Sequence, residues 1–387
     1  MGYLQSIRFP KVNRAELSKA RENKTLKIYL IKLRSKLKVF KVFINGYGII
    51  GSRLATAVSK DKSIKLIGIA KYSPDGKTED AIKSGFNVFV PKDSYKEFRK
   101  NNFDISGSIE NAILEADLVI DASSEGNGYK NKKKYYLPAK KKAIFQGGED
   151  RYGEKSVADM IHNSRVNYEQ ARKKDFVIQG SCNVTGMGKI IQPLVEKYGK
   201  SLKRFDVNLI RRWADLEDKK EVKDSIEWDK NPHHQEDLKD FIPKVNLFVD
   251  ALKVPSRMMH LHQMTIRFRG TPPSKDEILE LFQNEFGVAV LKNVKGTGEL
   301  RKQAIELGFE HGDTSMVHIH DELIRVQDDI LKISYSDDQT GMVIPENYML
   351  IQGMLLDKPR EEALKKAHRI FRINRKKKIL ERKFRGK

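Results

Sequence analysis

A glycine-rich turn close to the start of the globular pattern constrains the fold more than any other feature. Residues 41–44, Lys-Val-Phe-Ile, form a short apolar strand that leads directly into the sequence G-x-G-x-x-G at 46–51. Residues 52–59 are typical of a helix, and residues 64–70 are typical of a second strand. A strand, a glycine turn, a helix and a further strand predict a dinucleotide-binding βαβ unit.

Each glycine of this turn has a predicted role. Gly46 permits the tight turn, Gly48 lets the backbone approach a pyrophosphate, and Gly51 allows close packing of the helix on the strand. Ile49 and Ile50 follow at the helix start, where unpaired N–H groups and the helix dipole attract phosphate. A glycine-rich turn without a ligand remains the alternative.

The end of the second strand bears on the choice of cofactor. An NAD site usually has Asp or Glu there to hold the ribose 2′-hydroxyl, whereas this chain has Ala70-Lys71-Tyr72-Ser73. A cation at Lys71 favours the 2′-phosphate of NADP. We therefore expect NADP to be accepted, and NAD stays open. Alternatively, Lys71 faces solvent.

Strands and helices continue to alternate as far as residue 180. Further strands are expected over 118–122, 143–145 and 176–179, and helices over 95–101, 109–115 and 164–173. This alternation is typical of an α/β, Rossmann-type, doubly wound parallel sheet. The first domain is therefore expected to span residues 39–180.

The pattern changes after residue 180 to longer strands with alternating faces. The expected strands are 205–211, 244–253, 262–269, 288–294 and 330–335, and the expected helices are 274–285 and 298–307. They predict an α+β catalytic domain with a mixed sheet over 181–337. Helices near 345–355 and after Pro359 are expected to return to the first domain, so that residues 338–370 complete it.

The two ends of the chain are strongly basic. The net charge is +22, and residues 1–38 and 365–387 are rich in Lys and Arg. Such runs are usually solvated, which makes 1–38 a basic N-terminal extension and 371–387 a basic C-terminal tail. The charge also attracts polyanions, so nucleic-acid binding stays open as a main function or as a side activity of the tails. The chain has no aromatic platform or recognised motif for it.

Composition excludes several classes of protein. A hydrophobic content of 39% with 33% charged residues fits a soluble globular chain, and no apolar run approaches the roughly 18–20 residues of a membrane-spanning helix. The single cysteine excludes an internal disulfide and fits a reducing, cytoplasmic location. That cysteine is either a nucleophile or a small buried hydrophobe.

The surroundings of Cys182 favour the nucleophile. The segment 176–186, Phe-Val-Ile-Gln-Gly-Ser-Cys-Asn-Val-Thr-Gly, places Cys182 between a strand and a helix. The first N–H groups of that helix would lower the thiol pKa and form an oxyanion hole. Thiol chemistry on an aldehyde also needs a base, and nine histidines leave its identity open. If His260 and His262 share a strand, both point to the same face and both could approach the thiol.

Ser181-Cys182-Asn183-Val184-Thr185-Gly186 resembles the catalytic segment of the archaeal (type II) phosphorylating glyceraldehyde-3-phosphate dehydrogenases, usually Ser-Cys-Asn-Thr-Thr-Gly. The similarity extends from about residue 41 to about residue 370. It includes, in order, Asn45–Gly51, Phe145–Glu149, Arg211-Arg212, His233-His234, Met259–His262 and Val343–Asn347. The basic ends are not covered. In this chain, 338–341 is Asp-Gln-Thr-Gly where His-Gln-Glu-Ser is usual.

The resemblance implies a reaction, a cofactor and an assembly. The reaction is the reversible NAD(P)-dependent oxidation of glyceraldehyde 3-phosphate, with inorganic phosphate, to 1,3-bisphosphoglycerate through a thioester, in glycolysis or gluconeogenesis. Relatives of this type are homotetramers. Cys182 is implied as the nucleophile and His260 as the base.

The same resemblance, with the chemistry of the side chains, supplies the remaining candidate site residues. Gly148, Arg212 and Gln339 are expected at the cofactor, in addition to the glycine turn. Residues expected at the substrate and its phosphate groups are Ser181, Asn183, Thr185, Arg211, His233 and His234.

Two alternatives remain open at this stage. His233-His234 would suit a metal ion, but no Cys or third His lies at ligand spacing nearby, so no metal is expected. Aspartate-semialdehyde dehydrogenase also joins a Rossmann domain to a Cys/His thioester site, and its substrate carries a carboxylate and an amine in place of a phosphate.

Overall fold

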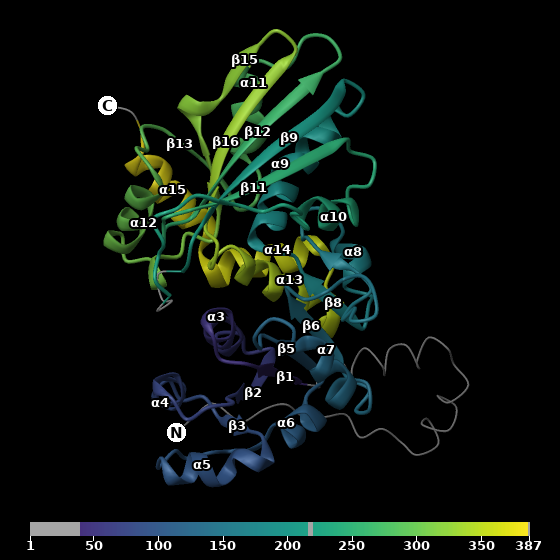
Figure 1. The fold of residues 1–387 in the computed structure, drawn as a ribbon, viewed down its shortest axis with the longest axis vertical. Helices are drawn as coiled ribbons and strands as arrows, with labels where there is room; N and C mark the ends of the chain where they lie inside the picture. The colour runs from purple at the N-terminus through teal and green to yellow at the C-terminus, as the bar shows by residue number, and fades with distance from the viewer. Residues whose placement is uncertain (1–38, 216–219, 386–387) are drawn as a thin grey trace, which may run out of the picture. The chain divides into compact units, whose positions relative to one another are not determined.

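The computed structural model describes residues 39–215 and 220–385 (Figure 1). The N-terminal extension predicted over 1–38 lies outside these residues. Within the described part of the chain, no helix combines the length and the apolar character needed to cross a membrane.

The first sheet is parallel throughout, with strand order β4-β3-β2-β1-β5-β6-β8-β7. Its strands are β1 (Phe40–Asn45), β2 (Ile64–Ala70), β3 (Val88–Val90), β4 (Gly107–Ser108), β5 (Leu118–Asp121), β6 (Lys142–Gln146), β7 (Ile161–His162) and β8 (Phe176–Gln179). The helices between them are α3 (Ile49–Ser59), α4 (Gly76–Lys83), α5 (Tyr95–Lys100), α6 (Ile109–Glu115), α7 (Gly128–Asn131) and α8 (Tyr168–Ala171). Strand and helix alternate because each strand is a short apolar run and each helix presents one apolar face to the sheet.

Register brings several strand ends to one edge of this sheet. Asn45 at the end of β1 pairs with Asp121 at the end of β5, and Gln146 at the end of β6 pairs with Gln179 at the end of β8. Ligands of open α/β sheets bind outside this carboxyl edge. The glycine turn after β1 and the cysteine segment after β8 therefore leave the sheet on the same side.

The second sheet is mixed, with strand order β10-β11-β9-β12-β16-β14-β13 and with β15 paired to β16. Its strands are β9 (Leu202–Arg212), β10 (Glu227–Trp228), β11 (Leu247–Val254), β12 (His260–Phe268), β13 (Val288–Leu291), β14 (Val317–His320), β15 (Arg325–Gln327) and β16 (Ile330–Asp337). The associated helices are α9 (Cys182–Tyr198), α10 (His234–Lys239), α11 (Lys275–Gln283) and α12 (Thr297–Glu306). The predicted fold class, a Rossmann-type parallel sheet plus an α+β part with a mixed sheet, is confirmed.

The chain ends in three helices, α13 (Val343–Leu356), α14 (Arg360–Phe371) and α15 (Ile373–Lys383). Helix α13 packs against α3 and α8 of the first sheet. Its Tyr348 donates to Asp61 at 2.7 Å, and its Glu346 forms a fully buried ion pair with Lys189 of α9 at 2.8 Å. Helix α13 thereby links the helix that begins at Cys182 to the first sheet.

Helix α8 is shorter than the helix predicted over 164–173. The Ser164 N–H and hydroxyl both donate to the carboxylate of Glu346, and the Asn163 N–H donates to Asn167 Oδ1. These bonds hold residues before 168 in turns. The prediction of a helix was wrong for residues 164–167 because Glu346, which binds Ser164, lies far away in the sequence.

The expectation of a solvated C-terminal tail is also wrong for most of residues 371–387. Ile373, Leu380 and Phe384 are buried, and α15 packs against β13. The N–H of Lys292 donates to the Phe384 carbonyl at 3.1 Å. Arg375, Lys378 and Arg382 lie on the exposed side of this helix, whose apolar positions recur at helical spacing, whereas Lys376 donates to the Asp313 carbonyl at 2.6 Å.

Truncating Leu380 tests this packing. Leu380 is fully buried in a cluster with Leu291 and Leu300, so Leu380→Ala should destabilise the protein by about 2–5 kcal/mol. Urea unfolding measures the change, and Lys378→Ala on the exposed side of α15 is the matched control. Equal stability of the two variants would mean that α15 does not pack as described.

Candidate active site

The geometry of the glycine turn fits a dinucleotide. Gly46 has φ +120, and a Cβ there would lie 2.4 Å from the Ala122 carbonyl oxygen. A Cβ on Gly51 would lie 2.1 Å from the carbonyl oxygen of Gly46. A Cβ on Gly48, by contrast, would meet nothing within 4 Å. Gly46 and Gly51 are thus required by the protein's own packing, whereas Gly48 keeps space free where a pyrophosphate would approach the start of α3.

A polar network fixes the strand ends beneath this turn. The Asn45 amide donates to the Tyr136 hydroxyl at 2.7 Å and accepts from the Tyr72 hydroxyl at 2.7 Å. Tyr136 in turn donates to Asp121 at 2.6 Å, and Asn131 donates to the same carboxylate. A satisfied buried network of this kind is rigid, so it holds the ends of β1 and β5 in one geometry.

Lys71 does not simply face solvent. It is 7% exposed, and its ammonium lies 2.7 Å from the Asp75 carboxylate. The same carboxylate accepts from Thr78 N–H and caps α4. Asp75 therefore neutralises the charge of Lys71 at the end of β2.

The start of α9 positions the thiol. Ser181 caps this helix by accepting from Val184 N–H at 3.3 Å, and Cys182, the first helical residue, is partly buried. A Cβ on Gly147 would lie 2.6 Å from the backbone nitrogen of Ser181, so the turn that also contains Gly148 runs directly against the helix start.

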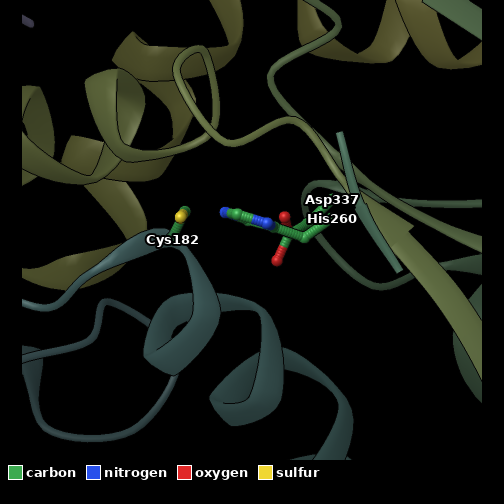
Figure 2. A group of neighbouring side chains, drawn as sticks. All are labelled: Cys182, His260 and Asp337. Atoms are coloured by element: carbon green, nitrogen blue, oxygen red, sulfur yellow. The ribbon is translucent and has the colours of Figure 1, made fainter. Parts of the chain in front are cut away.

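Three titratable side chains converge at this point (Figure 2). The Cys182 sulfur, a ring nitrogen of His260 and a carboxylate oxygen of Asp337 all lie within 4.8 Å of one another. His260 begins β12, Asp337 ends β16, and the two are direct partners in the antiparallel register. Directly paired residues point to the same face of a sheet. Figure 2 shows the imidazole pointing from the strand toward the sulfur.

A backbone hydrogen bond orients the ring of His260. The N–H of Arg212 donates to His260 Nδ1 at 3.2 Å. Burial lowers the pKa of His260 well below its usual value, and the nearby charge of Arg212 adds to the effect, so the ring is neutral.

Asn183, next to the thiol, bridges two other histidines. Its amide Nδ2 donates to His234 Nε2 at 3.1 Å, and its Oδ1 accepts from His262 Nε2 at 3.0 Å. All three residues are buried. Of the two candidate histidines, His262 has its Nε2 bound to Asn183, whereas His260 lies close to the sulfur.

The expected low pKa of the thiol is wrong for the ligand-free protein. Burial raises the pKa of Cys182 well above its ordinary value, and the nearby Asp337 carboxyl raises it further, against an opposing effect of Arg212. Helix α9 offers N–H groups and a positive dipole, but desolvation is the larger effect. The thiol is therefore protonated at neutral pH in this state.

Arg212 and Gln339, both expected at the cofactor, lie together. Each donates to the side chain of Asp215, with Gln339 at 3.4 Å. Arg212 Nε and Gln339 Oε1 are buried and have no hydrogen-bond partner among the described residues. Arg211 binds Asp229 at 3.2 Å, and its Nε is likewise unpartnered. Unpaired buried polar atoms are costly, so they mark places where a ligand or water completes the hydrogen bonding.

The structure brings His234 to the site and leaves His233 at its margin. His233 stacks on His234 with ring centroids 4.2 Å apart, but its side chain is exposed beside Asp237. The hydroxyl of Thr185 is fully buried and donates to the Gly180 carbonyl at 3.1 Å, which gives no support to a phosphate contact. Among the described residues, the histidine pair joins no third ligand, so the metal alternative gains no support.

Asp337 was missed by the sequence reasoning, although a signal was present. Alternate residues of β16, namely Leu331, Ile333 and Tyr335, are all fully buried, and Asp337 continues the same face. A carboxyl group on the core face of a strand is costly, which is a reason to suspect function.

The fold and these residues define a class of protein: a Rossmann-domain oxidoreductase with a cysteine–histidine pair. No family model matches the chain. It is 31% identical over 345 residues to a glyceraldehyde-3-phosphate dehydrogenase from Pyrobaculum calidifontis, with 87% of this chain and 98% of that protein covered. It is 34% identical over 321 residues to one from Methanococcoides burtonii, with 81% and 93% covered. The chain belongs to the archaeal-type glyceraldehyde-3-phosphate dehydrogenase family.

The pKa of the thiol predicts how Cys182 reacts with an alkylating reagent. Because the pKa is raised, the thiolate fraction at any pH is smaller than for an ordinary cysteine, with a pKa of about 8.5. Alkylation of the ligand-free protein by iodoacetamide should be slower than that of the urea-unfolded chain. Its rate should still be rising at pH 9. A plateau below pH 7 would instead show a thiolate of low pKa.

Proposed function

We propose that this enzyme catalyses the NAD(P)-dependent, phosphorylating oxidation of glyceraldehyde 3-phosphate to 1,3-bisphosphoglycerate. The observation that carries the proposal is the convergence of Cys182 and His260 within 4.8 Å in a chain that also has a dinucleotide turn. The archaeal relatives bear the name of this activity.

The residues supply nucleophile, orientation and charge. We assign Cys182 as the nucleophile that attacks the aldehyde carbon and His260 as the base that accepts the thiol proton, while the first N–H groups of α9 stabilise the oxygen of the adduct. A bound nicotinamide cofactor would supply the hydride acceptor, and loss of the hydride would convert the adduct into a thioester on Cys182. Inorganic phosphate then attacks the thioester carbonyl and releases the acyl phosphate. The thioester keeps enough acyl-transfer potential for phosphorolysis and makes the reaction reversible.

Arginine side chains favour the binding of the phosphate anions that take part in this reaction. The positive charges of Arg211 and Arg212 both lower the pKa of His260, and within the described part of the chain each guanidinium has an Nε without a hydrogen-bond partner. Guanidinium groups bind phosphate in a fixed fork geometry. We assign Arg211 and Arg212, together with His234, to the part of the site that binds the substrate phosphate group, the attacking inorganic phosphate and the nicotinamide ring.

The wider setting follows from the family. We propose a cytoplasmic homotetramer that serves glycolysis or gluconeogenesis. Both NADP and NAD are accepted, because no acidic side chain at the end of β2 is free to select NAD and Asp75 neutralises Lys71. Nucleic-acid binding is at most a side activity of the basic ends.

Replacement of the thiol tests the function directly. The wild-type protein should reduce NAD or NADP with glyceraldehyde 3-phosphate continuously only when phosphate or arsenate is present, since either one clears the thioester. Cys182→Ser should lose at least about 1,000-fold in rate, because an alcohol is a far weaker nucleophile. Absorbance at 340 nm measures both. Rates independent of phosphate and arsenate would contradict the phosphorylating reaction, and faster turnover of aspartate semialdehyde would favour the semialdehyde alternative.

The ion pair at the end of β2 makes cofactor preference testable. Asp75→Asn keeps a good helix cap for α4 but leaves the charge of Lys71 uncompensated. The ratio of KM for NAD to KM for NADP should rise about threefold or more. Lys71→Met should lower the same ratio. If neither variant changes it, Lys71 does not reach the 2′-position of the cofactor.

A further inference from the structure

A cavity apart from the Cys182 site lies between helix α3 and the C-terminal helices. Its volume is about 420 Å³, within the roughly 300–1,000 Å³ of sites that hold small molecules. The walls come from α3, from the segment 307–315, from Gly341 and Ile344, and from α14 and α15. They include neither the reacting side chains nor the glycines of the dinucleotide turn.

The walls carry more positive than negative charge. Five cationic side chains and two carboxyl groups line the cavity, namely Arg53, Lys60, Arg372, Arg375 and Lys376, and Glu310 and Asp313. Glu310 is bound by Lys60 at 2.9 Å, and Asp313 is bound by Arg53 at 2.6 Å. Within the described part of the chain, the other three cations form no ion pair. The cavity therefore has cations available to an anionic ligand.

Lys376 is the least solvated of these three cations. Its side chain is half-buried, its Nζ donates to the Asp313 carbonyl at 2.6 Å, and it lies 5.3 Å from the centre of the Phe309 ring. Burial lowers the pKa of Lys376, and nearby carboxyl groups oppose that effect. Arg372 and Arg375, one helical turn apart, are exposed. A partly desolvated ammonium without a counter-ion favours an anion beside it.

Much of the remaining wall is apolar. It includes Ala57, Leu307, Phe309, Ile344 and Ile379. An inorganic anion would leave this surface in water, whereas a ligand with a flat ring system would cover it. Guanidinium groups bind phosphate in a fixed fork geometry. Charge on one side and apolar surface on the other suit a ligand that joins two phosphate groups to a ring system.

We propose that this cavity is an effector site for a nucleoside diphosphate. The phosphate groups bind Arg372, Arg375 and Lys376, and the base lies on the apolar wall. The site is separate from the dinucleotide turn, and its ligand binding does not depend on the reaction proposed above.

The cavity wall is connected to the loop that contains Gln339, which is expected at the cofactor. The Asp313 carboxylate, bound by Arg53 of α3, also accepts from the Thr340 hydroxyl at 3.4 Å. Helix α3 in turn begins at the dinucleotide turn. A phosphate group that binds Lys376 competes with the Asp313 carbonyl for the same ammonium. Occupation of the cavity should therefore alter the contacts that hold this loop against α3, and with them turnover.

Binding of ADP to protein saturated with NADP tests the site. Because NADP fills the dinucleotide turn, calorimetry should detect one further ADP site per chain. Arg372→Gln combined with Arg375→Gln should weaken this binding about tenfold or more, since charge-assisted hydrogen bonds are lost. The matched control, Lys378→Gln with Arg382→Gln, removes the same charge from exposed positions of α15 outside the cavity. It should weaken binding less than about twofold, because salt screens distant charges.

Two further measurements address the ligand and the fold. Inorganic phosphate should displace ADP at least about tenfold more weakly than unlabelled ADP does, because it leaves the apolar wall uncovered. Both double variants should bind NADP and unfold in urea as the wild type does, which excludes a misfolded cavity. Thr56→Phe, which adds bulk to the wall without changing its charge, should also weaken ADP binding.

Turnover at saturating NADP tests the effector role. Saturating ADP should change the rate of glyceraldehyde 3-phosphate oxidation at least about twofold in the wild type. The same addition should leave the rate of the Arg372→Gln, Arg375→Gln variant unchanged.

The outcomes separate this inference from the proposed function. If the wild-type protein fails to oxidise glyceraldehyde 3-phosphate, the proposed function is wrong, and the binding measurements still test the cavity. The cavity is not a nucleoside diphosphate site if NADP-saturated protein does not bind ADP, if the control variant loses as much affinity as the cavity variant, or if inorganic phosphate competes equally well. If ADP binds but active enzyme turns over at an unchanged rate, the site is not an effector site.

Discussion

The amide of Asn183 connects the two parts of the reacting centre. It follows Cys182 at the start of α9, donates to His234 at 3.1 Å and accepts from His262 at 3.0 Å. His262 shares a strand face with His260, so the bond that fixes His262 also fixes the distance from the sulfur to the neighbouring ring. An amide has one donating and one accepting end, which makes it suited to join two neutral imidazoles. A carboxylate there would favour protonated rings, and an apolar side chain would leave two buried nitrogens unpaired.

Burial decides the protonation state of this centre. The thiol, the imidazole and the carboxyl group are each shifted toward the neutral form, because desolvation is the largest effect on all three pKa values. Under the function proposed above, charge would develop only as the substrate reacts, and the N–H groups of α9 would then stabilise it.

Local patterns predicted much of the fold and part of the site. The strands Ile64–Ala70 and Phe176–Gln179 have the predicted bounds, and Cys182 begins a helix as expected, because each depends on neighbours in sequence. The errors have a common cause. Residues 164–167 are held in turns by Glu346, and α15 is ordered by β13. The thiol pKa depends on burial and on the carboxyl group of Asp337, which lies far away in the sequence. Contacts between residues so far apart in the sequence cannot be predicted from local periodicity.

Asp337 occupies a position in this sheet where stability alone would favour another residue. The face that it continues is occupied by Leu331, Ile333 and Tyr335, and an apolar residue would complete that face at lower energetic cost. The close approach of Gly186 adds to the cost, since a helix interior is less stable with glycine than with alanine. Two adjacent positions on different elements thus carry residues that folding alone does not favour. Both are explained if the carboxyl group has to lie beside the sulfur, within 4.8 Å of it.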